Sequence, residues 1–199
     1  MSLYPLFLKL SGRRVLVVGG GPVATAKVAA LQEAGAIIAV VAPEAEPELV
    51  QAAAAGKISL ARRSFDAADL AGTWLVVSAA TPEVNRVVAA AAESQRLFVL
   101  AVDDQSAASA YGAGTLRRGG VTVAVSTEGR APALAGLLRE ALEAVLPDDL
   151  AAWTAEAERL RVGWREAGVP MAERRPLLLR ALNQLYQGKS STNDDKVTP

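Results

Sequence analysis

The chain has 199 residues, of which 51% are hydrophobic, enough for one substantial domain with an appendage or for two small domains. Its 21 basic and 21 acidic residues give a formal net charge of zero, which argues against nucleic acid or an anionic membrane surface as the main partner. No apolar run approaches the roughly 20 residues that span a bilayer, and the N-terminus lacks the layout of a secretory signal. The composition therefore predicts a soluble, cytoplasmic protein.

Two residue types that often carry chemistry are missing. The chain has no cysteine, which excludes disulfides, thiolate nucleophiles and thiolate metal sites. It also has no histidine, the side chain that titrates nearest neutrality and the commonest metal ligand. Proton transfer must therefore depend on Asp, Glu, Lys, Tyr or water.

Strand and helix patterns alternate through the first half of the chain. The predicted strands cover residues 14–18, 37–41, 58–61, 74–79 and 98–102, and the predicted helices cover residues 23–34, 46–55 and 82–94. Residues 65–70 look like a loop or a single turn. Such alternation predicts an α/β fold with a parallel sheet covered by helices on both faces. A Rossmann-type strand order, 3-2-1-4-5, would place a ligand crevice beyond the carboxyl ends of the first and fourth strands.

The first predicted strand runs directly into Gly19-Gly20-Gly21-Pro22-Val23-Ala24. Gly19, Gly21 and Ala24 fit the G-x-G-x-x-G/A fingerprint in its strand–turn–helix context. Gly19 would allow the tight turn, Gly21 would let a pyrophosphate approach the backbone, and Ala24 would keep the helix close to the strand. Pro22 and Val23 open the helix, and the N-terminus of this helix would present free N–H groups to the anion. A dinucleotide site is predicted; the alternative is a glycine-rich turn that binds no ligand.

The pattern changes after Asp104. Residues 107–116 and 121–126 suit a hairpin, with Arg117-Arg118-Gly119-Gly120 as its turn. A stripe of apolar residues, mostly leucine, from Leu134 to Val145 predicts a helix with Pro132 near its start. Asp148 could cap a further helix to about Ala167, and residues 171–186 suit the last one, which Pro176 would kink or begin.

The hairpin and the leucine-rich helix cannot easily bury themselves against a sheet already covered by helices. Pairing with a second copy would bury them, so a homodimer is expected, the alternative being a subdomain packed on the same chain. The predicted regions are a dinucleotide-binding domain (1–106), a dimerisation region (107–147), a helical domain (148–188) and a polar, disordered tail (189–199).

Several segments, in order and at compatible spacing, resemble those of one family. They are Leu3-Tyr4-Pro5-Leu6-Phe7-Leu8, the glycine loop followed by Lys27, Phe65-Asp66, Trp74-Leu75-Val76-Val77-Ser78-Ala79-Ala80-Thr81 with Asn85, Val102-Asp103 with Ala107-Ala108-Ser109, Val123-Ala124-Val125-Ser126-Thr127 with Gly129 and Pro132, Leu138-Arg139-Glu140, and Met171-Ala172-Glu173-Arg174-Arg175. On these segments the chain resembles the precorrin-2 dehydrogenase family, also found as the N-terminal part of sirohaem synthases. The resemblance implies oxidation of precorrin-2 to sirohydrochlorin with NAD as hydride acceptor. Some members of that family also insert ferrous iron, so iron or cobalt is a further candidate substrate.

One carboxylate is well placed for the proton that such a reaction releases. Asp103 follows directly on the fifth predicted strand, where the crevice rule puts it at the mouth of the nucleotide site. The resemblance assigns the catalytic position to the same residue, and an apolar pocket could raise its pKa toward a useful range. The alternative is that Asp103 caps a turn together with Asp104.

The cofactor's ribose and nicotinamide ends also have candidate residues. Pro43 and Glu44 follow the second strand, where NAD sites place an acidic residue, and no arginine at that strand end invites a 2′-phosphate. This favours NAD over NADP. Small residues from Ser78 to Thr81 end the fourth strand, and Ala80 and Thr81 are expected to border the cofactor, although ordinary packing would also explain them.

The substrate carries many carboxylates, so its pocket needs cations or N–H donors. The candidate cations are Lys27, Arg117, Arg118 and Arg130, although solvated surface charge explains each arginine equally well. The resemblance adds Ser109, Ser126 and Thr127 to the substrate cleft, and it leaves any protein metal ligands unknown.

Two other functions stay open at this point. The chain could be an NAD enzyme that acts on another small molecule, because a fold does not fix a substrate. It could also be a redox-sensing, NAD-binding regulator, although it contains no basic recognition helix.

Overall fold

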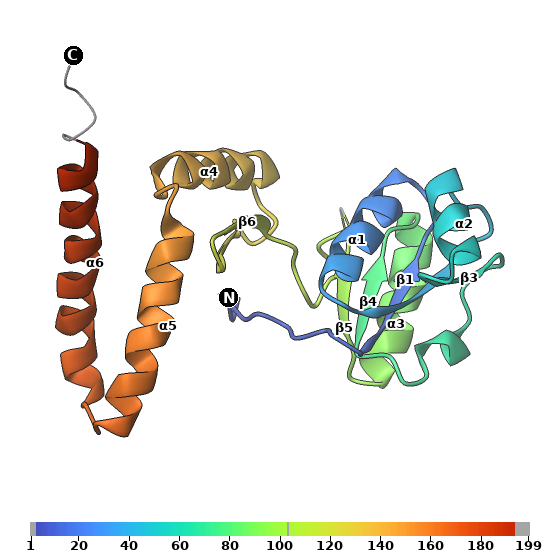
Figure 1. The fold of residues 1–199 in the computed structure, drawn as a ribbon. Coiled ribbons are helices and arrows are strands. Elements are labelled where there is room, and N and C mark those ends of the chain that lie inside the picture. The colour runs from blue at the N-terminus through green and yellow to red at the C-terminus, as the bar shows by residue number, and fades with distance from the viewer. Residues whose placement is uncertain (1–2, 103, 194–199) are drawn as a thin grey trace, which may run out of the picture. The chain divides into compact units, whose positions relative to one another are not determined.

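The computed structural model describes residues 3–102 and 104–193, with residues 185–193 described by their backbone alone. The chain forms two compact units (Figure 1). The first comprises the described part of Met1–Gly112 together with Ser126–Ala131, and the second comprises Ala113–Val125 and the described residues from Pro132 onward. The first unit thus takes in residues 107–112 and 126–131, which lie beyond the boundary predicted at residue 106.

A parallel sheet of five strands forms the centre of the first unit. In chain order its elements are β1 (Arg14–Val18), α1 (Pro22–Glu33), β2 (Ile37–Val41), α2 (Pro47–Ala54), β3 (Ser59–Ala61), the 3₁₀-helix η1 (Ala67–Leu70), β4 (Leu75–Ser78), α3 (Pro82–Ser94) and β5 (Phe98–Ala101). The strand order is β3-β2-β1-β4-β5, and every pair is parallel. The predicted α/β class and the predicted strand order are both confirmed.

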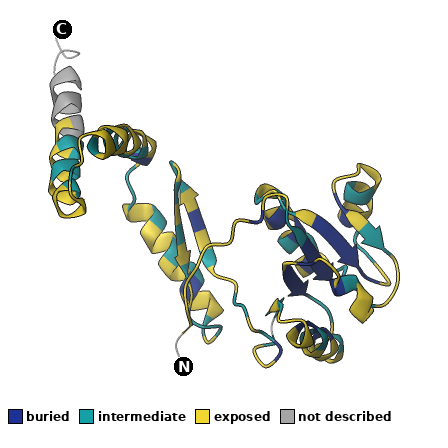
Figure 2. Cartoon of the chain, turned by 90° about the horizontal axis from the view of Figure 1, so that it is seen from below, coloured by how far each residue is buried: buried dark blue, intermediate teal, exposed yellow. Residues whose placement is uncertain are grey.

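Both faces of the sheet are buried, because the strand side chains alternate between two apolar layers. Val15 and Val17 pack with α1 and α2 on one face, whereas Leu16 and Val18 pack with α3 and η1 on the other. Figure 2 shows the buried residues concentrated in this sheet. Trp74 is an exception to the prediction of a buried strand: it lies just before β4, is 59% exposed, and carries the Arg13 guanidinium over its ring.

The free edge of β5 is covered by an irregular segment that the sequence analysis assigned to a strand. Ser109 donates its backbone N–H to the carbonyl of Val99 (2.9 Å) and accepts the Val99 N–H with its hydroxyl (2.8 Å). The strand prediction for residues 107–113 is therefore wrong. This segment of small residues satisfies the exposed strand edge locally instead of extending into a ladder.

The second unit consists of a hairpin and three helices: β6 (Gly114–Arg118), β7 (Val121–Val125), α4 (Pro132–Val145), α5 (Leu150–Glu166) and α6 (Met171–Asn193). The hairpin turn is Gly119-Gly120 alone, with positive φ at both residues, so Arg117 and Arg118 belong to β6.

The last two helices differ from the prediction at their ends. Asp149, not Asp148, precedes α5, and its side chain makes no capping hydrogen bond. Pro176 lies inside α6, which begins at Met171, so the alternative that it marks the helix start is wrong. The helix continues to Asn193, past the predicted end at 186 and into the region expected to be disordered; residues 194–199 lie outside the described part of the chain.

Little of the second unit is buried. Among its described side chains only Leu116, Ala135 and Leu150 are buried hydrophobic residues. None of the helices in the described part of the chain is long and apolar enough to cross a membrane.

Candidate functional site

A cavity of about 530 Å³ opens at the carboxyl ends of β1, β2, β3 and β4. Six residues predicted for the cofactor line it: Gly19, Gly21, Pro43, Glu44, Ala80 and Thr81. Pro22 and Val23 follow Gly21 as the first two residues of α1 and are exposed. The loops that end four separate strands thus meet around one space, as expected for a doubly wound sheet.

The three glycines of the first loop occupy different environments. Gly19 has φ +123°, and a Cβ there would overlap the carbonyl oxygen of Ala79. A Cβ on Gly20 would overlap the carbonyl oxygen of Glu44, and Gly20 itself accepts a hydrogen bond from the Glu46 N–H (2.8 Å). A Cβ on Gly21 would meet no atom within 4 Å.

Gly21 therefore offers space where a ligand can approach the backbone. It is the N-cap of α1 and makes no side-chain cap. Because Pro22 has no N–H, the first N–H groups available at this helix end are those of Val23 and Ala24. An open glycine at a helix N-terminus fits the pyrophosphate of a dinucleotide. Gly20 was missed by the sequence analysis, since only the structure reveals how closely it approaches the second loop.

The wall after β4 is held by a buried polar group on α3. The Asn85 side chain is 1% exposed, and its Oδ1 accepts hydrogen bonds from the Ser78 hydroxyl (2.6 Å) and the Ala80 N–H (3.2 Å). These bonds fix the short loop that carries Ala80 and Thr81. Ser78 is fully buried and supports the wall from behind.

The loop between β3 and η1 supplies a further wall that the sequence analysis did not include. Ser64 and Phe65 line the same cavity as Pro43 and Glu44. Pairing of β3 with β2 also brings Arg62 and Arg63, which follow β3, beside the carboxyl end of β2. The premise that no arginine lies near this strand end is wrong, because the residues that approach it are distant in sequence.

The predicted catalytic residue, Asp103, lies outside the described residues. Val102, which precedes it, donates its N–H to the carbonyl of Ser78 (2.9 Å) at the end of β4. Asp104 closes a turn by accepting hydrogen bonds from the Ser106 hydroxyl (2.6 Å) and from the Ser106 and Ala107 N–H groups. The hydrogen bond from the Ser106 hydroxyl holds the pKa of Asp104 below its usual range.

A second turn packs against this loop. Gln105 donates its side-chain N–H to the carbonyl of Gly129 (2.6 Å), which joins the Asp104 turn to residues 126–131. The Ser126 hydroxyl accepts the Glu128 N–H and the Thr127 hydroxyl accepts the Ala131 N–H, both at 3.1 Å. The structure thus brings Ser126, Thr127 and Arg130 to the loop that follows Asp103.

The remaining polar candidates have local partners. Arg130 pairs with Glu128 (3.0 Å) and is 75% exposed. Ser109 lines a separate cavity of about 330 Å³ that is bordered by Arg86 and Glu93 on α3. It does not line the cavity of the glycine loop, and its hydroxyl accepts a hydrogen bond from the Val99 N–H on β5.

The three other candidate cations lie on different elements. Arg118 donates to the carbonyl of Leu146 (2.8 Å), just after α4, and approaches Glu143 and Asp148, all in the second unit. Arg117 is exposed on β6, whereas Lys27 on α1 lies partly buried near Gly112. In the part of the chain that the structure describes, no three acidic side chains gather as a metal site.

Comparison with known proteins gives two family matches. Residues 6–112 match the family model described as "Putative NAD(P)-binding", and residues 118–144 match the model described as "Sirohaem biosynthesis protein central".

The chain is 40% identical over 199 residues to siroheme synthase 3 of Aeromonas hydrophila and 38% identical over 184 residues to the siroheme synthase of Photorhabdus laumondii. These alignments cover 100% and 92% of this chain, but only 42% and 39% of the relatives. Among solved structures, "SirC, precorrin-2 dehydrogenase" superimposes with a TM-score of 0.68 and 26% identity, covering 89% of this chain and 88% of that one. The first family model spans more than half of the chain, which therefore belongs to the putative NAD(P)-binding family.

Proposed function

We propose that this chain oxidises precorrin-2 to sirohydrochlorin with NAD as the hydride acceptor. The observation that supports a dinucleotide cofactor is the open position at Gly21, at the N-terminus of α1. Gly21 lines the same cavity as Glu44. The likeness to a precorrin-2 dehydrogenase along 89% of the chain, and to siroheme synthases along its whole length, supports the substrate.

Different residues of the cavity would bind different parts of the cofactor. The backbone at Gly19 and Gly21 and the start of α1 would bind the pyrophosphate. There Val23 would donate the first N–H, and Pro22, which has none, would begin the helix. Pro43 and Glu44 would border the adenosine ribose, where a carboxylate accepts hydrogen bonds from its hydroxyl groups. Ala80 and Thr81 would leave room for the rest of the molecule. When bound, NAD supplies the acceptor for the hydride.

The proton that leaves the substrate needs a base, and we assign this role to Asp103. Its neighbour Val102 is bonded to the end of β4, close to the wall of the cavity. Ser126, Thr127 and Arg130 would bind the substrate from the adjoining turn, which Gln105 ties to the loop after Asp103. Arg130 is the cation of this group and would pair with a substrate carboxylate. Ser109 remains a weaker candidate, since its hydroxyl is bonded to β5.

An anaerobic assay with purified protein tests the reaction. Precorrin-2 and NAD are mixed with the enzyme, and absorbance follows the conversion to sirohydrochlorin. Ferrous iron or cobalt is then added, and faster metal incorporation with enzyme than without would support chelation as a second activity. Lack of conversion despite NADH binding would favour a dehydrogenase of another small molecule or a redox-sensing regulator.

Asp103→Asn tests the base directly. The carboxylate is lost while the side chain keeps its size, so the rate of oxidation should fall by about 10²-fold or more, and NADH should bind as before. A full rate in the variant would exclude Asp103 as the base.

The second unit supports a homodimer as part of this proposal. Five large apolar residues of α4 are exposed: Leu134, Leu137, Leu138, Leu142 and Val145. They recur at helical spacing and form one apolar stripe, which a second copy of the chain would cover. The cytoplasmic location stays a prediction from the sequence.

A further inference from the structure

Arg62 and Arg63 come between β3 and Ser64, which lines the cavity where the adenosine ribose is expected. The carbonyl of Ala61, the last residue of β3, accepts hydrogen bonds from the N–H groups of both Ala42 (3.1 Å) and Arg63 (3.0 Å). Ala42 begins the turn that continues into Pro43 and Glu44. The backbone of Arg63 and the start of that turn are therefore hydrogen-bonded to the same carbonyl group. The next residue, Ser64, lines the cavity.

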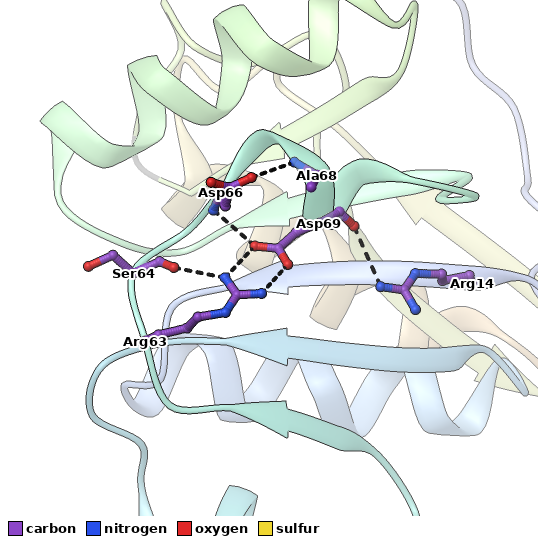
Figure 3. A network of polar contacts seen from close by, with 6 residues as sticks. All are labelled: Arg14, Arg63, Ser64, Asp66, Ala68 and Asp69. Atoms are coloured by element: carbon purple, nitrogen blue, oxygen red, sulfur yellow. Dashed lines mark hydrogen bonds and ion pairs between the residues drawn. The ribbon is translucent and has the colours of Figure 1, made fainter.

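The guanidinium of Arg63 is occupied by other groups (Figure 3). Its two terminal nitrogens donate to the two carboxylate oxygens of Asp69, at 2.8 and 2.5 Å, and one of them also donates to the carbonyl of Ser64 at 2.9 Å. The guanidinium and the carboxylate thus form a bidentate ion pair, joined by two hydrogen bonds. The hydrogen bonds lower the pKa of Asp69 and raise the pKa of Arg63, so both groups stay charged at neutral pH.

Asp69 is itself held in place. It is the third residue of η1, and one of its oxygens accepts the Asp66 N–H at 2.9 Å, while Asp66 accepts the Ala68 N–H at 2.8 Å. The Asp69 side chain is only 10% exposed, compared with 51% for Arg63. The carboxylate is therefore the fixed member of the pair, and the arginine is the member that would move if the pair were broken.

We propose that Asp69 is a positioning residue that withholds Arg63 from the ribose end of the cavity and so selects a dinucleotide with a free 2′-hydroxyl over one with a 2′-phosphate. An unpaired arginine beside the ribose is the usual means of binding a 2′-phosphate. Glu44, on the neighbouring loop, repels such a phosphate, and the ion pair removes the cation that would compensate. This inference rests on the proposed use of the cavity for a nicotinamide dinucleotide.

Direct binding of NADH and NADPH, followed by fluorescence titration of the full chain, tests the proposal. The wild type should bind NADH more tightly than NADPH. Asp69→Asn keeps an oxygen for the Asp66 N–H but breaks the ion pair, so it should bind NADPH about tenfold more tightly, a gain of roughly 1.4 kcal/mol, and NADH within about twofold of the wild type. A second substitution, Arg63→Ala, should abolish this gain, whereas Arg62→Ala in the same background should leave it.

Asp66→Asn is the matched control, because it removes a carboxylate from the same turn without touching the hydrogen bonds of Arg63. An equal gain in NADPH affinity in this control, or a gain that survives Arg63→Ala, would overturn the proposal, since loss of negative charge alone would then explain it. A parallel loss of affinity for both dinucleotides would also overturn it, because Asp69 would only be shaping the wall at Ser64.

Two further outcomes keep the result interpretable. If Asp69→Asn fails to fold by circular dichroism, Asp69→Ser retains a hydroxyl oxygen for the Asp66 N–H and replaces it, with the same expected gain. If the wild type binds neither dinucleotide, the proposed cofactor site is wrong. Tight NADH binding with unchanged NADPH affinity in both Asp69 variants leaves the site intact and refutes the role of Asp69 alone.

Discussion

Gly19 and Gly21 lie two residues apart, but only Gly19 lacks space for a side chain. Alanine at position 19 would have to adopt a positive φ and would overlap the Ala79 carbonyl. We expect Gly19→Ala to lower the free energy of unfolding by about 3 kcal/mol or more. Gly21→Ala meets no atom within 4 Å and should change it by less than about 1 kcal/mol.

Gly21→Ala should affect cofactor binding although it has little effect on stability. Gly21→Ala places a methyl group where the pyrophosphate would approach, so the Kd for NADH should rise by about tenfold or more in a protein that remains folded. Urea unfolding and fluorescence titration measure the two effects separately. Unchanged NADH affinity in Gly21→Ala would contradict the assigned position of the pyrophosphate.

The hydrogen bonds accepted by the Asn85 side chain should contribute both to stability and to cofactor binding. Asn85→Ala leaves the buried Ser78 hydroxyl and the Ala80 N–H without their acceptor, which should cost about 1–3 kcal/mol of unfolding free energy. NADH affinity should also fall, because the loop at Ala80 loses its support. Ser94→Ala, which removes an exposed hydroxyl at the end of the same helix, serves as the control and should change neither quantity.

At the scale of elements, η1 and the loop before it respond to acid through Asp69. The Arg63 hydrogen bonds hold the pKa of this carboxyl below its usual range, so the ion pair stabilises the fold fully above about pH 4. The stabilisation is lost as the pH falls through the lowered pKa of the folded state. The difference in unfolding free energy between the wild type and Asp69→Asn should therefore shrink from pH 7 to pH 3 in urea titrations. An equal difference at both pH values would show that the charge of Asp69 is not what stabilises the turn.

Elements with strong periodicity could be predicted, and those that depend on tertiary contacts could not. The buried strands and α3 follow from apolar runs and from Pro82, and the fold order follows from their alternation. The segment at Ser109 was mistaken for a strand because its small apolar residues resemble one, whereas its hydrogen bonds to Val99 form without a regular ladder. The same limit explains the cavity: Gly19, Gly21 and Glu44 could be predicted from a motif, whereas Phe65 enters only through the pairing of β2 with β3.

At the scale of the whole molecule, the two units differ in how much apolar surface they bury. The first has two continuous apolar layers around its sheet, whereas few described residues of the second are buried and α4 is largely exposed (Figure 2). A hairpin and helices with so small a core gain little stability from their own packing. In the proposed homodimer, a second copy of the chain would cover the apolar residues of α4.

The exposed stripe of α4 leads to a prediction for the assembly. Leu137 is 63% exposed, and Leu137→Glu would place a charge in the proposed contact, so the variant should be monomeric under conditions where the wild type is a dimer. Sedimentation velocity over a range of concentrations measures this. Val87→Glu is the matched control, since Val87 lies on α3 of the first unit and is 60% exposed, and it should leave the dimer intact. A wild type that stays monomeric at every concentration would show that α4 is not a contact between copies of this chain. That result would favour the alternative in which the region packs on its own chain, because a leucine-rich surface of this extent is unfavourable in water.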